Sequence, residues 1–292
     1  MQVRLIRNPI SGSGGVGTLV AELARRIAAG GGYLDVCETE APGDASRLAA
    51  LTPPDTRAVI CAGGDGTLRE VVSGMIGKRV PILVLPTGTE NVLAKHFGYR
   101  RNVAAILDTL ERGCEEAYDV GVCGQRKFIL LAGVGFDGDV VKRLHEARRG
   151  NITHLTWAVP LLEGFIAHPY PEVSVAVDGR EVFCGRGLVF VGNIARYSLG
   201  MRVLDQARTD DGLLDVRVLP CRTRRELVGY GLRMLLHRPI RRQDALYLQG
   251  HTVRVWSARG ETVPVQIDGD YGGSLPIECS VIAGAVRFLR PA

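Results

Sequence analysis

The segment Gly63-Gly64-Asp65-Gly66-Thr67 constrains the fold of this chain more than any other. It follows an apolar run at residues 57–62 and precedes a helical pattern of apolar residues at 68–76. Three glycines in four positions leave the main chain bare, so that another group can come close to it. Because bare amide groups at the start of a helix attract anions, the segment predicts a strand, a tight turn and a helix whose start binds phosphate.

Asp65 lies in the middle of this turn. A carboxylate there would repel a phosphate unless a cation lay between the two groups. The combination of bare amides and an acid therefore indicates a phosphate that is bound together with its Mg²⁺. The alternative is an ordinary glycine-rich turn in which Asp65 caps the following helix. The turn alone does not decide between these interpretations.

The composition is that of a globular protein with two domains. The chain has 292 residues, of which 46% are hydrophobic and 23% are charged, and this length exceeds that of a usual single domain. The net charge of +5 suits an anionic membrane surface, a nucleic acid or a nucleotide. Aromatic residues make up only 6% of the chain. Because few aromatic rings argue against a stacking platform for single strands, we expect no nucleic acid partner.

The seven cysteines are scattered and form no Cys-x-x-Cys pair. This spacing predicts neither a zinc site nor a disulfide framework, and it fits a reducing cytoplasm. The first residues carry no hydrophobic signal-peptide segment, and no apolar run approaches the roughly 18 residues that span a bilayer. We therefore expect a cytoplasmic protein that contacts a membrane only peripherally, from the aqueous side.

The first half of the chain alternates strands and helices. Apolar runs predict strands at 3–6, 33–39, 57–62 and 80–85, with helices between them. This alternation implies a Rossmann-like parallel sheet with helices on both faces. Polar, glycine-rich turns follow the first, third and fourth strands. We expect these turns at the carboxyl edge of the sheet, where such sheets bind their ligands.

A dinucleotide fingerprint is formally present after the first strand. Gly12-x-Gly14-x-x-Gly17 has the required spacing, and Asp35 or Glu38 lies near the expected position for the acid that binds ribose. An NAD-dependent dehydrogenase is therefore an alternative function. A Walker A loop is rejected, because Thr18 stands where that motif needs lysine.

From about residue 122 the pattern changes to short strands that are separated by turns. We place the domain boundary there, with an α/β domain at residues 1–122 and a β-rich domain at residues 123–292. Many short alternating strands predict an antiparallel β-sandwich or open barrel. The strands predicted in this part lie at 127–133, 173–177, 181–184, 188–191, 214–219, 252–256, 263–267, 277–281 and 285–289, and a helix at 224–236 interrupts them.

Six short motifs occur in order along the chain. They are Asn8-Pro9-x-Ser11-Gly12, the turn at 63–67, Pro86-x-Gly88-Thr89-x-Asn91-x-Leu93-Ala94, Gly133-x-Gly135-x-Asp137, Asp211-Gly212-Leu213-Leu214-Asp215 and Asp268-Gly269-Asp270. Together they resemble the diacylglycerol kinase catalytic domain family, which includes bacterial lipid kinases and sphingosine kinases. The resemblance spans nearly the whole chain, and the family has the same order of a nucleotide-binding α/β domain and a β-rich domain.

The resemblance implies a lipid kinase, a phosphotransferase with an alcohol group as acceptor. Such an enzyme transfers the γ-phosphate of MgATP to a hydroxyl of diacylglycerol or a related lipid at a membrane surface. The first domain would bind ATP and Mg²⁺, and the second domain would bind the lipid. The residues implied to contact the nucleotide are Asn8, Thr39, Gly63, Gly64, Asp65, Gly66, Thr67, Glu70, Thr89 and Asn91.

The family places a general base at the position of Asp270, which would accept the proton of the lipid hydroxyl. Asp65 and Asp137 are the other implied catalytic residues. Asp211 resembles a ligand of a structural Mg²⁺, assisted by backbone carbonyl groups of Arg208 and Leu213. An exposed strand edge in the second domain could support a homodimer, although nothing in the sequence requires one.

The base position departs from the family, which usually has glutamate where this chain has Asp270. The aspartate side chain is shorter by roughly 1.5 Å, and a misplacement of about 1 Å can cost about 100-fold in rate. A nucleotide-binding regulator that has lost catalysis is therefore an alternative. Because NAD kinases share the Gly-Gly-Asp-Gly-Thr turn, a phosphotransferase with a soluble acceptor is another.

Several of these residues also have a purely structural interpretation. Asp268 and Asp270 fit a hairpin turn, Asp137 fits a helix cap and Asp211 fits an ordinary turn. The helix predicted at 224–236 carries several leucines and is surrounded by arginines. It fits a membrane-surface patch or a solvated rim, and the rim is the preferred interpretation.

Overall fold

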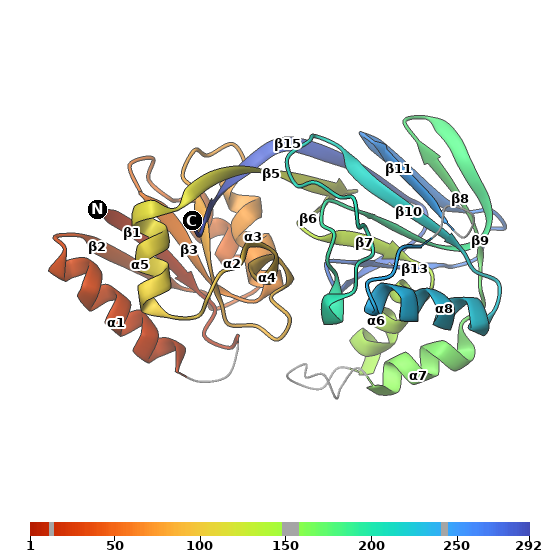
Figure 1. Cartoon of the computed structure of the whole chain (residues 1–292), viewed down its shortest axis with the longest axis horizontal. Helices are drawn as coiled ribbons and strands as arrows, with labels where there is room; N and C mark the ends of the chain where they lie inside the picture. The colour runs from red at the N-terminus through yellow and green to blue at the C-terminus, as the bar shows by residue number, and fades with distance from the viewer. Residues whose placement is uncertain (12–14, 148–157, 241–244) are drawn as a thin grey trace. The chain divides into compact units, whose positions relative to one another are not determined.

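The protein divides into two compact units (Figure 1). The structure, a computed structural model, describes residues 1–11, 15–147, 158–240 and 245–292. The first unit contains residues 1–118 and 284–292, and the second contains residues 119–283. The sequence placed the boundary at residue 122 and left the C-terminal segment in the second domain. Within the described ranges, no helix combines the length and the apolar character needed to cross a membrane.

A parallel sheet forms the centre of the first unit. Its strands are β1 (Gln2–Arg7), β2 (Tyr33–Glu38), β3 (Ala58–Gly63), β4 (Ile82–Pro86) and the end of β15 (Ile277–Arg290). Their order is β15-β4-β3-β1-β2, and each neighbouring pair is parallel. Every residue of β3 is buried, as expected of a strand that is covered on both faces. The predicted parallel sheet is therefore confirmed.

Helices cover this sheet in two groups. They are α1 (Val16–Ala29), α2 (Asp44–Ala50), α3 (Asp65–Met75), α4 (Val92–Phe97) and α5 (Val103–Arg112). α1 contacts α5 and α2 contacts α3, and Figure 1 shows the sheet between these two pairs. α1 buries Val20, Leu23 and Ile27, whose spacing places them on one helical face.

The C-terminal strand β15 completes the sheet. Phe288 lies opposite Ile82 of β4 in a parallel pair. Its fully buried ring is centred 5.2 Å from the ring of Phe97 and 5.1 Å from that of Tyr118. The sequence predicts a strand at 285–289 but assigns it to the second domain. Its pairing with β4 is a long-range contact, which local patterning does not reveal.

The second unit is an antiparallel, β-sandwich-like domain, as predicted. Its strands include β7 (Leu131–Val134), β8 (Glu172–Val177), β9 (Arg180–Gly192), β10 (Leu214–Pro220), β11 (Leu246–Gly250), β12 (Thr252–Ser257), β13 (Pro264–Ile267) and β14 (Asp270–Ser274). Val189 and Val191 of β9 join one apolar cluster, whereas Leu188 and Phe190 join a second. This alternation is the period of a strand that is covered on both faces. The second cluster includes side chains of α6 (Phe136–Ala147), α7 (Ala158–Ala167) and α8 (Arg224–Leu235).

Two details of this domain differ from the prediction. β9 is one continuous strand, whereas the sequence predicts strands at 181–184 and 188–191. The two glycines at 185 and 187 suggest a break in the sequence pattern. In the structure Gly185 pairs with Val173 of β8 and Gly187 pairs with Pro220 of β10, so the strand pairing continues through both glycines. β14 is absent from the prediction because glycines occupy the middle of its short sequence.

Phe288→Ala is expected to lower the free energy of unfolding by about 3–5 kcal/mol, because it removes a buried ring from a packed cluster. Urea denaturation of the variant and the wild type, followed by circular dichroism, measures this change. The matched control is Arg287→Ala, which alters an exposed neighbour on the same strand. If both variants were as stable as the wild type, the C-terminal strand would not be part of this sheet.

Candidate active site

Three turns of the first unit meet at the carboxyl edge of its sheet. They follow β1, β3 and β4, which are neighbours in the strand order. A Cβ atom placed on Gly88 would lie only 2.6 Å from the Cα of Gly64. A Cβ on Gly63 would lie 2.5 Å from the Cβ of Thr67. Glycine is therefore required where these main chains approach each other.

Polar side chains hold the turns together. The Asn8 Nδ2 donates a hydrogen bond to the Thr67 hydroxyl at 3.1 Å. The Ser11 and Thr87 hydroxyl oxygens lie 3.3 Å apart. Asn91 accepts a hydrogen bond from the Gly88 amide at 2.9 Å and donates one to its carbonyl oxygen at 2.6 Å. The two asparagines predicted at the nucleotide site thus shape the turns themselves.

Asp65 is the first residue of α3, but its carboxylate reaches another helix. Its Oδ2 accepts a hydrogen bond from the Val92 amide at 3.1 Å, and its Oδ1 accepts one from the Leu93 amide at 3.5 Å. Burial raises the pKa of Asp65, and the two amides partly oppose this shift. Asp65 therefore caps the start of α4 rather than its own helix. Its predicted catalytic role stays a prediction.

The start of α3 has room for a ligand. The first amides of a helix have no carbonyl partner within that helix, and those of α3 follow the bare Gly63-Gly64 turn. A Cβ atom on Gly66 would meet no atom within 4 Å, so the space beside it is open. Exposed amides and the positive end of the helix dipole together fit a phosphate group.

The remaining residues predicted to contact the nucleotide lie around these turns. Thr39 follows β2, and its amide donates a hydrogen bond to the Arg7 carbonyl oxygen at 2.9 Å. Thr89 lies in the turn between β4 and α4, and the half-buried Glu70 lies on α3. Gly12 of the first motif lies outside the described residues. The first unit thus brings the described members of the predicted set to one edge of the sheet, apart from Glu70, which lies farther along its helix.

The ribose-binding acids of a dehydrogenase are already paired. Asp35 forms an ion pair with Arg4 at 2.7 Å, and Glu38 forms one with Arg7 at 2.9 Å. Gly12 and Gly14 of the dinucleotide fingerprint lie outside the described residues. The arrangement therefore gives no support to the dehydrogenase alternative.

Asp137 of the second unit lies in the first turn of α6. The Tyr197 hydroxyl lies 3.2 Å from both carboxylate oxygens of Asp137. Burial raises the pKa of Asp137 to about 6. Hydrogen bonds from Gln266 and Tyr197 favour the charged form and partly oppose this rise. A Cβ on Gly133 would lie 2.1 Å from Oδ2 of Asp137. The glycine therefore makes room for the carboxylate. No motif in the sequence pointed to Tyr197 or Gln266.

Asp268 fixes the hairpin that carries Asp270. Its buried carboxylate accepts hydrogen bonds from three successive backbone amides, at 2.8, 2.9 and 3.1 Å, which belong to residues 129–131. Asp268 also has a positive φ of 50°, which is typical of a tight turn. Asp270 begins β14 and is exposed. The hairpin interpretation is therefore right for this segment, and it leaves the Asp270 side chain accessible.

The residues predicted to hold Mg²⁺ form a closed turn. The Asp211 Oδ1 accepts a hydrogen bond from the Leu213 amide at 3.1 Å, and the Gln249 amide nitrogen lies 3.4 Å from its Oδ2. The Arg208 side chain pairs with Asp210 at 3.2 Å. Within the described ranges, no three His, Cys, Asp or Glu side chains are grouped as metal ligands. The predicted set combines one carboxylate with two backbone carbonyl groups, so these residues stay a predicted Mg²⁺ site.

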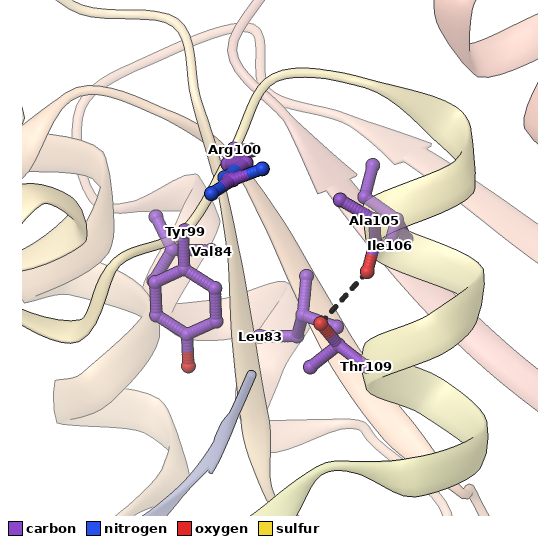
Figure 2. Close-up of a pocket in the computed structure, with 7 residues that line it drawn as sticks. All are labelled: Leu83, Val84, Tyr99, Arg100, Ala105, Ile106 and Thr109. Carbon is purple, nitrogen blue, oxygen red and sulfur yellow. Dashed lines mark hydrogen bonds between the residues drawn. The ribbon is translucent and has the colours of Figure 1, made fainter. Parts of the chain in front are cut away.

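A small recess lies beneath α5, away from these residues. It is lined by Leu83, Val84, Tyr99, Arg100, Ala105, Ile106 and Thr109 (Figure 2). Its cavity volume is about 10 Å³, which is about the room that one water molecule needs. None of the predicted site residues lines it, and a recess of this size has no room for a nucleotide or a lipid.

Asp137→Asn is expected to change the pH dependence of stability. The pKa of Asp137 rises from 3.8 to about 6 on folding, so the charged carboxylate destabilises the folded state more and more as the pH rises through this range. Relative to the wild type, the variant should gain up to about 3 kcal/mol between about pH 4 and about pH 6. Urea denaturation at several pH values measures the difference. A difference that stays constant with pH would contradict this assignment.

Two family models match the chain. Residues 2–123 match the diacylglycerol kinase catalytic domain, and residues 131–290 match the YegS C-terminal NAD kinase beta sandwich-like domain. A diacylglycerol kinase of Bacillus subtilis (strain 168) is 27% identical over 99% of this chain and 96% of that protein. An uncharacterized protein of Synechocystis sp. is 22% identical over 80% of this chain, and the chain spans about half, 54%, of that protein.

A solved structure has the same fold. The crystal structure of a diacylglycerol kinase from Bacillus anthracis str. Sterne aligns with a TM-score of 0.73 at 21% identity, covering 99% of this chain and 96% of the other. The two family models occur in the order that the motifs predicted. The protein therefore belongs to the diacylglycerol kinase catalytic domain family and is a phosphotransferase of the kinase class.

Proposed function

We propose that this protein is an ATP-dependent lipid kinase that transfers the γ-phosphate of MgATP to a hydroxyl of diacylglycerol or a related lipid. The observation that carries this proposal is the start of α3, where bare amides border open space beside Gly66. Relatives named diacylglycerol kinase supply the acceptor class. Peripheral contact with a membrane follows, because such an acceptor resides in a bilayer.

The first unit is proposed to hold the nucleotide. Its phosphates would lie against the amides of residues 64–67, with the Thr67 and Thr89 hydroxyl groups as further donors. Asn8 and Asn91 would keep the turns in place through the hydrogen bonds described above. The Mg²⁺ of this proposal arrives with ATP and neutralises charge on its phosphates.

The second unit is proposed to supply the general base. The Asp270 carboxylate would take the proton of the lipid hydroxyl while that oxygen bonds to the γ-phosphorus. The bond between the γ-phosphorus and the bridging oxygen then breaks, and ADP leaves with the electron pair. Asp137 is the second candidate carboxylate, because a pKa of about 6 lets it hold or release a proton near neutral pH.

A soluble acceptor is the second candidate function. The family model matched by residues 131–290 is described as NAD kinase beta sandwich-like. This description favours a nucleotide acceptor, whereas the catalytic-domain match favours a lipid. A catalytically silent regulator is the third possibility, since Asp270 is shorter than the usual glutamate. Acceptor screening with labelled ATP separates all three.

Asp270→Ala is expected to lower the rate of phosphate transfer to lipid by about 10²- to 10⁴-fold, because a general base contributes about this much. The assay follows labelled γ-phosphate from MgATP into a lipid extract dispersed in detergent. Asp270→Asn tests the charge alone, and Glu181→Gln, an exposed acid on β9, is the matched control. Full activity in Asp270→Ala would exclude Asp270 as the base. Transfer only to NAD by the wild type would favour the soluble acceptor, and MgATP binding without any transfer would favour the regulator.

Gly66→Ala and Gly88→Ala are expected to separate nucleotide binding from folding. The methyl group of Gly88→Ala collides with Gly64, whereas that of Gly66→Ala meets no protein atom within 4 Å. Gly88→Ala should therefore lose both stability and MgATP binding. Gly66→Ala should keep at least wild-type stability but bind MgATP at least about 10-fold more weakly, because its methyl group fills the open space through which the phosphate would reach the amides. Calorimetric titration and thermal unfolding measure the two effects, and unchanged affinity in Gly66→Ala would place the phosphate elsewhere.

A further inference from the structure

Exposed apolar side chains are concentrated on two helices of the second unit. Among the described residues, eight of the fourteen exposed large hydrophobic side chains belong to α7 and α8 or to the residue that ends α8. Scattered exposed apolar residues are normal, but a contiguous patch marks an interaction site. We name this set the α7–α8 surface; its members are Val159, Leu161, Leu162, Ile166, Val228, Leu232, Leu235 and Leu236.

α8 has two apolar faces. Leu227, Tyr230 and Met234 are buried against the domain at the spacing i, i+3, i+7. A second stripe at residues 228, 232, 235 and 236 has the spacing i, i+4, i+7, i+8, and it points to solvent. Leu232, for example, is 52% exposed. The buried stripe accounts for the packing of α8 on its own domain, so the second stripe is available to a partner.

α7 adds a matching stripe beside α8. Val159, Leu162 and Ile166 lie at the spacing i, i+3, i+7 and are exposed. The guanidinium of Arg224 at the start of α8 donates a hydrogen bond to the Ile166 carbonyl oxygen. Phe165 of α7 packs against the same apolar cluster that holds α8. The two helices are therefore neighbours, as Figure 1 also shows.

Arginines lie on and beside α8, the second helix of the α7–α8 surface. The segments 158–167 and 222–240 contain five arginines and only two glutamates, Glu163 and Glu226. Four of the arginines, at 222, 224, 225 and 238, are exposed. The Glu226 carboxylate accepts a hydrogen bond from the Thr223 amide at 3.0 Å as part of a capping box. The surface thus combines an apolar centre with a clear excess of positive charge.

We propose that the α7–α8 surface docks this protein on bilayers rich in anionic phospholipid. The leucines would enter the boundary between headgroups and acyl chains, and the arginines would contact the phosphates above them. A second copy of this chain fits less well, because a two-fold contact through this surface would set arginines against arginines. The proposal rests on the proposed function, which requires an acceptor in a membrane, and it replaces the solvated-rim interpretation of this helix.

The test measures co-sedimentation of the full chain with vesicles. The wild type should bind vesicles of equal parts phosphatidylglycerol and phosphatidylcholine, and should bind pure phosphatidylcholine weakly. Leu232→Glu/Leu235→Glu should weaken binding at least about 10-fold, and Arg222→Gln/Arg225→Gln about 10-fold or more, with the largest loss at low salt. The matched controls are Leu51→Glu, which is 63% exposed in the first unit, and Arg180→Gln, an exposed arginine at the start of β9.

A fluorescent reporter gives an independent measurement. Leu235→Trp should show a blue-shifted emission when the phosphatidylglycerol vesicles are added, because the indole leaves water, whereas Leu51→Trp should not. Equal binding by the wild type and both double variants would overturn the proposal. Loss of self-association in Leu232→Glu/Leu235→Glu, measured by sedimentation velocity, would also overturn it and assign the surface to a second copy.

Phosphate transfer to detergent-dispersed lipid separates this proposal from the proposed function. If the double variants lose vesicle binding but keep that transfer, both proposals are supported. If the wild type transfers phosphate but does not bind the vesicles, only the docking surface is wrong. If the wild type binds the vesicles through these residues but phosphorylates no lipid, the docking surface stands and the proposed acceptor is wrong.

Discussion

The approach of two main chains, at Gly64 and Gly88, is the contact on which the candidate nucleotide site depends. A Cβ atom on Gly88 would lie 2.6 Å from the Gly64 Cα, so no other residue fits there without moving a turn. This approach brings the turns after β3 and β4 together, and the Asp65 carboxylate joins them by accepting hydrogen bonds from the Val92 and Leu93 amides. Asn8 links the turn after β1 to Thr67. The site is therefore built from backbone packing before any ligand contributes.

Local sequence patterns predicted the parts of this arrangement that neighbouring residues determine, which are the buried strands and the glycine-rich turns. Buried parallel strands give apolar runs and bare turns give glycines, so the sheet of the first unit and its three turns could be recognised. The role of Asp65 could not be predicted from the local pattern, because a carboxylate in this turn could equally well cap its own helix or bind the amides of another segment. Its real partners are amides 27 and 28 residues farther along the chain. The pairing of β15 with β4 is long-range for the same reason.

Asp268 and Asp270 also show that a role set by distant partners cannot be predicted from the local sequence, here within a segment of three residues. Both are aspartates beside Gly269, and composition gives no means to rank them. The Asp268 carboxylate is buried and accepts hydrogen bonds from the amides of residues 129–131, which lie 137 to 139 positions earlier in the chain. Asp270 remains exposed on β14. The family resemblance could identify Asp270 as the candidate base. Only the folded structure shows that Asp268 anchors the hairpin on which Asp270 lies.

α8 shows what charge alone leaves undetermined in the second unit. Arginines around a helix usually indicate a solvated face, and the sequence shows only that leucines alternate with them. Packing divides the apolar residues of α8 into two stripes, and the domain covers one of them. An exposed apolar stripe in water favours association with any apolar partner, whereas surrounding arginines disfavour a second copy of the same surface. The anionic bilayer that we propose as the partner would satisfy both constraints, and it would also hold the proposed lipid acceptor.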